Sequence, residues 1–192
     1  MHGHKITNQN NLHFLTLTTV GWIDVFTRSE YRDIVIDSFC FCQHKKGLKL
    51  FAYVIMSNHI HLIARAEEQY RLSDIIRDFK KFTAITIIRK IEEEKESRKD
   101  WLLMVMKYHA NYNKNNRTYQ FWQQRNHPIE LYSPDFIQQK LDYIHLNPVR
   151  AKWVLKKEDY LYSSASNYFN GTGLLEVEIL DLPLSNIGYI SS

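Results

Sequence analysis

The sequence is poor in cysteine and has no long apolar run. Its two cysteines are Cys40 and Cys42. They lie two residues apart on a predicted helix, where their side chains diverge by roughly 200° and are poorly placed for a disulfide. No apolar stretch approaches about 18 residues, so we expect no membrane span. The polar N-terminal residues 1–11 lack an apolar signal region. These absences favour a reducing, cytoplasmic setting.

The size and charge of the chain fit a modest single domain. Its 192 residues suit one domain rather than two, and an apolar content of 44% is enough for a sizeable core. We therefore expect one domain over residues 1–192, in which residues from about 171 to 192 form a C-terminal extension. A net charge of +4 is compatible with a polyanionic partner but does not identify one.

The apolar patterns predict an α+β fold. Period-two patterns predict strands over residues 13–20, 48–56, 59–66 and 118–124. Helical spacing predicts a helix that Gly47 ends and a long helix that begins at Ser73. A further helix should begin at Pro134 and end near Leu146, because Pro148 disfavours helix at the residue before it. This order predicts a mainly antiparallel central sheet with helices packed on one face.

His59 and His61 form the most informative motif. They lie on a predicted strand that follows a turn at Ser57 and Asn58, and residues i and i+2 of a strand point the same way. Both imidazoles should therefore project from one face, while Ile60 faces the core. Two imidazoles side by side on a strand make half of a divalent-metal site. The spacing alone leaves open that they are ordinary half-buried polar residues.

Tyr143 is a candidate nucleophile. On a helix it shares a face with Asn147, whereas Ile137, Leu141 and Ile144 form a different stripe that suits the core. A neutral phenol is a poor nucleophile, but a metal ion stabilises the negative charge that develops when a phosphodiester is attacked. The chain has twelve tyrosines and most helical tyrosines are structural, so the residues alone leave several possible nucleophiles.

The ordered set of motifs resembles a known transposase family. His59-Ile60-His61 resembles the His-hydrophobe-His motif of the HUH single-strand endonucleases. Its setting, residues 53–62, resembles the single-tyrosine transposases of the insertion-sequence type, especially the REP-associated tyrosine transposases. Residues 142–151 are similar to their nucleophile helix, and residues 121–124 and 159–164 resemble their flanking elements. The resemblance covers about residues 12–170 and implies a ferredoxin-like HUH nuclease core.

The resemblance also implies a mechanism. His59 and His61 would bind Mg²⁺ or Mn²⁺, which polarises the scissile phosphate. Tyr143 would attack this phosphate, giving a 5′-phosphotyrosine bond and a free 3′-hydroxyl, and a second 3′-hydroxyl would rejoin the strands. In relatives, a polar side chain four residues after the tyrosine completes the metal site. That position is Asn147 here, and its side chain is shorter than the glutamine of some relatives. We expect any contact between Asn147 and the ion to run through water.

The implied partner is single-stranded DNA next to imperfect hairpins. The basic residues predicted to contact its phosphates are Arg77, Lys80, Lys81, Arg150 and Lys152. For each of these residues, a place on a solvated charged surface without any DNA contact is an equally good interpretation. The aromatic residues predicted to stack on unpaired bases are Tyr119, Phe121 and Trp122, at least one of which should belong to the core.

Two other functions stay open on the sequence. The chain can be a non-catalytic, domesticated protein that binds DNA or RNA hairpins, or a metal-dependent phosphodiesterase that acts on small molecules with water as the nucleophile. A homodimer is also open. Some insertion-sequence relatives place each tyrosine against the partner's histidines, whereas REP-associated ones can work as monomers.

Overall fold

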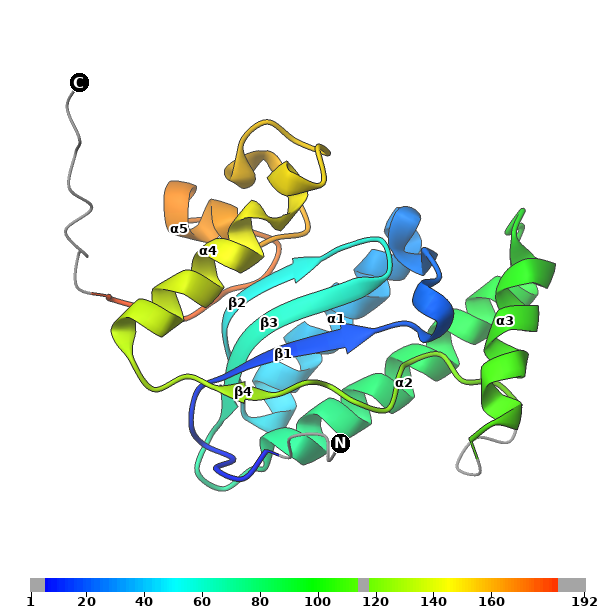
Figure 1. Ribbon diagram of the computed structural model, residues 1–192, viewed down its shortest axis with the longest axis horizontal. Coiled ribbons are helices and arrows are strands. Elements are labelled where there is room, and N and C mark those ends of the chain that lie inside the picture. The colour runs from blue at the N-terminus through cyan, green and yellow to red at the C-terminus, as the bar shows by residue number, and fades with distance from the viewer. Residues whose placement is uncertain (1–5, 114–117, 183–192) are drawn as a thin grey trace.

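The computed structural model describes residues 6–113 and 118–182, which fold around a four-stranded antiparallel sheet (Figure 1). The strands are β1 (His13–Thr18), β2 (Leu48–Ile55), β3 (His59–Ala66) and β4 (Ile129–Glu130), in the order β2-β3-β1-β4. The helices are α1 (Ser29–Lys46), α2 (Leu72–Glu93), α3 (Lys99–Asn111), α4 (Pro134–Arg150) and α5 (Ala165–Asn170). Short 3-10 helices are η1 (Val20–Trp22), η2 (Val25–Thr27) and η3 (Lys157–Asp159). The predicted α+β class is confirmed.

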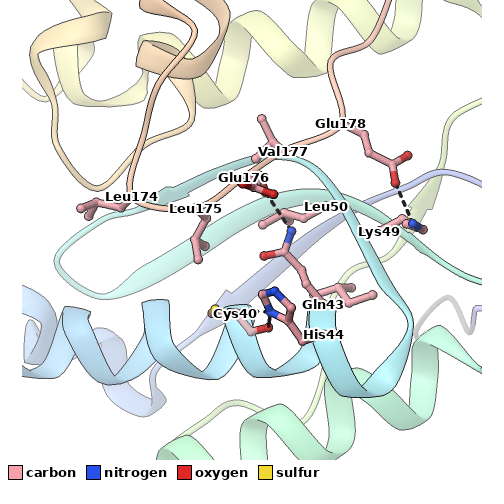
Figure 2. A pocket seen from close by; sticks show the side chains of 11 residues that line it. Cys40, Gln43, His44, Lys49, Leu50, Leu174, Leu175, Glu176, Val177 and Glu178 are labelled. Atoms are coloured by element: carbon pink, nitrogen blue, oxygen red, sulfur yellow. Dashed lines mark hydrogen bonds and ion pairs between the residues drawn. The ribbon is translucent and has the colours of Figure 1, made fainter.

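The helices cover both faces of the sheet. On one face, α1 and α2 pack side by side, with the rings of Phe39 and Phe79 stacked at 4.4 Å between centroids. On the other face lies α4, as Figures 1 and 2 show. The sequence predicts helices on one face of the sheet, and α1 and α2 fit this prediction. In addition, α4 covers the opposite face. This explains why β3 is buried along most of its length rather than on alternate residues.

The predicted strand over residues 118–124 is wrong in detail. Trp122 forms only an isolated bridge with Thr19, and regular pairing with β1 begins later, at β4. The physical reason is that the rings of the consecutive residues Phe121 and Trp122 both pack on Phe26, at 6.1 and 5.6 Å between centroids. A regular strand would send them to opposite faces. The segment nevertheless follows the free edge of β1, where the Thr16 amide donates to the Asn126 carbonyl at 2.9 Å.

The end of α4 also differs from the prediction. The helix does not end near Leu146 but continues through Pro148 to Arg150. A proline inside a helix removes one backbone hydrogen bond, and this cost is confined to the last turn because the helix ends two residues later. The consequence matters for the site. Asn147 is helical and lies one turn after Tyr143, as the i, i+4 spacing requires.

The C-terminal extension packs against its own chain as far as residue 182 (Figure 2). The Glu178 amide donates to the Leu50 carbonyl at 2.9 Å, and the Glu178 carboxylate lies 3.1 Å from Lys49 Nζ. Gln43 on α1 donates to the Glu176 carbonyl at 2.8 Å. The extension thus covers the exposed edge of β2, which would otherwise present unpaired backbone groups. The part of the extension over residues 183–192 lies outside the described residues. Among the described helices, none has the length and apolar character to cross a membrane.

Candidate active site

The register of β1 against β3 places the two histidines beside two threonines. His61 lies opposite Thr16, and His59 lies opposite Thr18. The imidazole centroids are 4.6 Å apart, and the ring planes meet at 68°. Ile60, between them, is fully buried on the other face. The structure therefore brings His59 and His61 together, as the strand period predicts.

Each imidazole has one nitrogen fixed by a neighbour. His59 Nδ1 lies 2.7 Å from Asn58 Oδ1, and His61 Nδ1 lies 2.9 Å from Thr16 Oγ1. The Asn58 amide is oriented because its Nδ2 donates to the Trp22 carbonyl at 3.2 Å. Asn58 Oδ1 must then accept from His59 Nδ1, which leaves Nε2 of this ring with its lone pair. Asn58 is thus more than the turn residue that the sequence suggests. The part played by Thr16 has no local sequence signal.

The free nitrogen of His61 fits a metal ligand. Within the described residues, His61 Nε2 is buried and has no hydrogen-bond partner. Leaving a buried polar atom unpaired is costly, and a cation would satisfy it. Burial lowers the pKa of His61 to about 3, with smaller effects from the charges of His59 and Lys140, and burial also lowers the pKa of His59. Both rings are therefore neutral at pH 7, which is the form that binds metals.

A metal ion at the histidine pair would need further ligands. In the part of the chain that the structure describes, no three His, Cys, Asp or Glu side chains gather in a way that could hold a metal. Oxygen atoms from water or from a phosphate would have to complete the coordination, with Asn147 in contact only through water. Mg²⁺ commonly keeps several waters and takes phosphate oxygens in this way.

Tyr143 packs directly against the histidine pair of its own chain. Its ring centroid lies 5.0 Å from that of His61, with the planes at 68°. Phe14 contacts both rings, at 5.3 Å from His61 and 6.0 Å from Tyr143. Tyr143 nevertheless remains 38% exposed. The phenol is therefore held beside the imidazoles and stays accessible to a substrate.

Two cationic side chains on the same stripe of α4 lie near the Tyr143 ring. Lys140 Nζ lies 5.9 Å from the centroid of the Tyr143 ring, and Arg150 Cζ lies 5.7 Å from it. With Asn147, these residues follow helical spacing at positions 140, 143, 147 and 150. Lys140 was not among the residues predicted from the sequence, although this spacing points to it once Tyr143 is singled out.

The other predicted DNA contacts divide into two groups. Arg150 ends α4 and Lys152 follows it. The remaining three belong to α2, on the sheet face away from the histidines, so the structure does not bring them to the site. Arg77 pairs with Asp74 and Asp78 at 2.7 and 3.0 Å.

The two lysines of α2 have different surroundings. Lys80 donates to the Gln123 carbonyl at 2.6 Å and to Asn126 Oδ1 at 2.7 Å, and burial lowers its pKa to about 8. Lys81 borders a hollow between α1 and α2. A DNA contact by any of the three α2 residues stays a prediction.

The exposed aromatic residue beside the site is Trp22 rather than the predicted ones. Phe121 and Trp122 are core residues, so the expectation that they stack on bases is wrong, and Tyr119 is partly buried. Trp22 is 60% exposed and its ring centroid lies 6.3 Å from that of His59. Its backbone has φ of +55°, a conformation that residues other than glycine rarely adopt. No sequence pattern marks it.

His145 lies outside the site. It is buried and its Nε2 lies 2.9 Å from Ser164 Oγ. Burial lowers its pKa to about 4. This histidine ties α4 to the segment that precedes α5, and its role is structural.

Comparison with known proteins identifies the family. A family model described as "Transposase IS200 like" matches residues 9–116, which include the histidine pair. A solved REP-associated tyrosine transposase bound to a REP hairpin shares the fold. It is 17% identical, with a TM-score of 0.60 over 95% of this chain and 94% of that one. A putative transposase from Deinococcus radiodurans is also 17% identical, with a TM-score of 0.43 over 76% of this chain and 98% of that one. No curated protein matches. Since the family model spans more than half of its length, the chain belongs to the IS200-like transposase family.

Proposed function

We propose that this transposase cleaves and rejoins single-stranded DNA next to a hairpin, with Tyr143 as the nucleophile. The observation that carries the proposal is the contact between an exposed phenol and a paired-imidazole site. Tyr143 is 38% exposed, and its ring lies 5.0 Å from that of His61, whose buried Nε2 has no partner among the described residues. The transposase family and a fold shared with a protein bound to a REP hairpin support DNA as the substrate.

In the proposed step, Tyr143 Oη forms a bond to phosphorus and loses its proton, while the bond from phosphorus to the 3′-oxygen breaks. The leaving oxygen takes up a proton, so the products are a 5′-phosphotyrosine and a free 3′-hydroxyl. When a 3′-hydroxyl attacks the phosphotyrosine, the phenol leaves and a DNA strand is rejoined. Because one diester is exchanged for another, no external energy source is needed.

His59 and His61 are the residues that would hold the ion, with Asn147 as a water-mediated contact. A bound Mg²⁺ or Mn²⁺ would supply Lewis-acid polarisation of the phosphate. Asn58 and Thr16 orient the two rings through their Nδ1 atoms. Mutation of residues that orient metal ligands in this way commonly lowers metal affinity or activity by about 10- to 100-fold.

The test is formation of a covalent protein–DNA adduct. A pool of single-stranded hairpins with randomised flanks, labelled at the 3′ end, is incubated with the protein and Mn²⁺. We expect labelled DNA that stays on the protein in SDS, and that is absent when EDTA is added. Hairpin binding without any cleavage would instead support a binding protein. Hydrolysis of bis-p-nitrophenyl phosphate without an adduct would support a phosphodiesterase.

Trp22 is the proposed stacking platform for an unpaired base next to the cleaved phosphate. Stacking on an aromatic ring contributes about 1–3 kcal/mol per base, so Trp22→Ala should weaken hairpin binding by about 10-fold or more. Fluorescence anisotropy with a hairpin recovered from the adduct measures this. Trp101→Ala is the matched control, because Trp101 is 45% exposed on α3. Equal affinities for the two variants would exclude the platform.

A further inference from the structure

Lys140 lies inside the site, among aromatic side chains. Its ammonium is 5.0 Å from the centroid of Phe14, 5.3 Å from that of Phe136 and 5.9 Å from that of Tyr143. Among the described residues, no ion pair involves Lys140, whereas Lys46 and Lys49 pair with carboxylates at 3.3 and 3.0 Å. A partly buried lysine beside the proposed nucleophile is thus left with its charge unneutralised by the described part of the protein.

The aromatic rings position this charge. Ring faces attract a cation, and the four-carbon stem of lysine packs along apolar surface. Phe14 stacks on His61 at 5.3 Å as well as lying beneath Lys140, so one ring relates the ammonium to the imidazoles. Tyr143 also contacts both. A phosphate placed between the phenol and the histidine pair would therefore lie within reach of Lys140 Nζ.

The chemistry of phosphoryl transfer gives such a cation a role. As the Tyr143 oxygen approaches phosphorus and the 3′-oxygen departs, negative charge builds on the non-bridging phosphate oxygens. A donor positioned at that point stabilises the transition state more than the ground state, and so raises the rate rather than the affinity. Arg150 lies at the other end of the α4 stripe and is exposed, which suits contact with the DNA on either side of the scissile phosphate.

We propose that Lys140 is a catalytic residue whose ammonium donates a hydrogen bond to a non-bridging oxygen of the scissile phosphate while Tyr143 attacks. Lys140 keeps its proton throughout. The proposal rests on the proposed strand-transfer function and adds to it a catalytic residue outside the histidine pair and the tyrosine.

The first test compares Lys140→Met, Lys140→Arg and Lys45→Met in single-turnover adduct formation with Mn²⁺. We expect Lys140→Met to lower the rate by about 100-fold, as the loss of one positioned donor does, with hairpin Kd within about three-fold of wild type. Lys140→Arg should recover much of the rate because it keeps the charge. Lys45 is exposed near the end of α1, so Lys45→Met should match wild type. A hairpin affinity that falls as much as the rate would make Lys140 a general DNA contact and overturn the proposal.

The second test neutralises the substrate instead of the protein. A methylphosphonate at the scissile position replaces one of the two non-bridging oxygens with a methyl group, and its two phosphorus diastereomers are tested separately. In the diastereomer whose methyl group takes the place of the oxygen that Lys140 contacts, Lys140→Met and the wild-type protein should form adduct at similar rates. A 100-fold defect that persists on both diastereomers would overturn the catalytic role. On the natural phosphate, equal rates of adduct formation by the wild-type protein and Lys140→Met would overturn only the role of Lys140. If the wild-type protein formed no adduct on the natural phosphate, the strand-transfer function would be overturned as well.

Discussion

Tyr143→Phe should abolish the covalent DNA adduct while leaving hairpin binding intact. We expect the rate of adduct formation to fall by about 10⁴-fold or more, because the nucleophilic oxygen is removed. The ring that remains keeps its contacts with His61 and Phe14, at 5.0 and 6.0 Å between centroids. Because Tyr143 is partly exposed, the protein should stay folded. Gel separation of labelled DNA in SDS measures the adduct, and anisotropy measures the binding.

Two controls show whether the loss of adduct is specific to Tyr143 and to its own chain. Tyr132→Phe removes the hydroxyl of an 83% exposed tyrosine just before α4 and should leave the adduct unchanged. Mixing Tyr143→Phe with His61→Gln tests which chain supplies the nucleophile. Since Tyr143 contacts the His61 of its own chain, the mixture should form no adduct. Recovery of activity in the mixture would show that a second copy supplies the tyrosine, and an adduct with Tyr143→Phe alone would refute the mechanism.

His61→Gln should abolish metal-dependent cleavage, with a loss of about 10³-fold or more. Glutamine keeps most of the volume of the side chain, but its amide nitrogen has no lone pair to replace that of the buried imidazole Nε2, which has no partner in the described part of the chain. A second readout does not depend on activity. An ion that binds only the folded protein raises its stability, by about 2.7 kcal/mol at 100 times its Kd. Mn²⁺ should therefore raise the Tm of the wild type and have little effect on His61→Gln.

His145→Gln is the matched control for this substitution. His145 is another buried histidine, on α4, that contacts Ser164 rather than the site. Its replacement should lower the baseline Tm but leave the increase caused by Mn²⁺ unchanged. If His61→Gln kept the Mn²⁺ response and full cleavage, the histidine pair would have no metal role.

The parts of the site that the sequence predicts depend on local geometry. The period of a strand places His59 and His61 on one face, and the turn at Asn58 precedes them as expected. The period of a helix places Tyr143 and Asn147 together, although the predicted end of α4 was too early. The likeness of these motifs to a transposase family was also correct.

The parts that the sequence does not predict depend on contacts between distant segments. The role of Thr16 requires the register of β1 against β3, and Trp22 is held by the Asn58 amide. Helical spacing shows that Arg77 and Lys80 share a side of α2, but not that α2 lies on the sheet face away from the histidines. Helical spacing from Tyr143 points to Lys140, but its place beside Phe14, which stacks on His61, depends on how α4 packs on the sheet.

The most direct test of the proposed mechanism is the identity of the residue that carries the DNA. Adduct formed on the hairpin pool is digested with nuclease and protease, and mass spectrometry locates the nucleotide remnant that stays on the protein. We predict the remnant on Tyr143, joined through a 5′-phosphate, and its absence in Tyr143→Phe. A remnant on another tyrosine such as Tyr132, or cleaved DNA with a free 5′-phosphate and no modified peptide, would contradict the assignment of Tyr143 as the nucleophile.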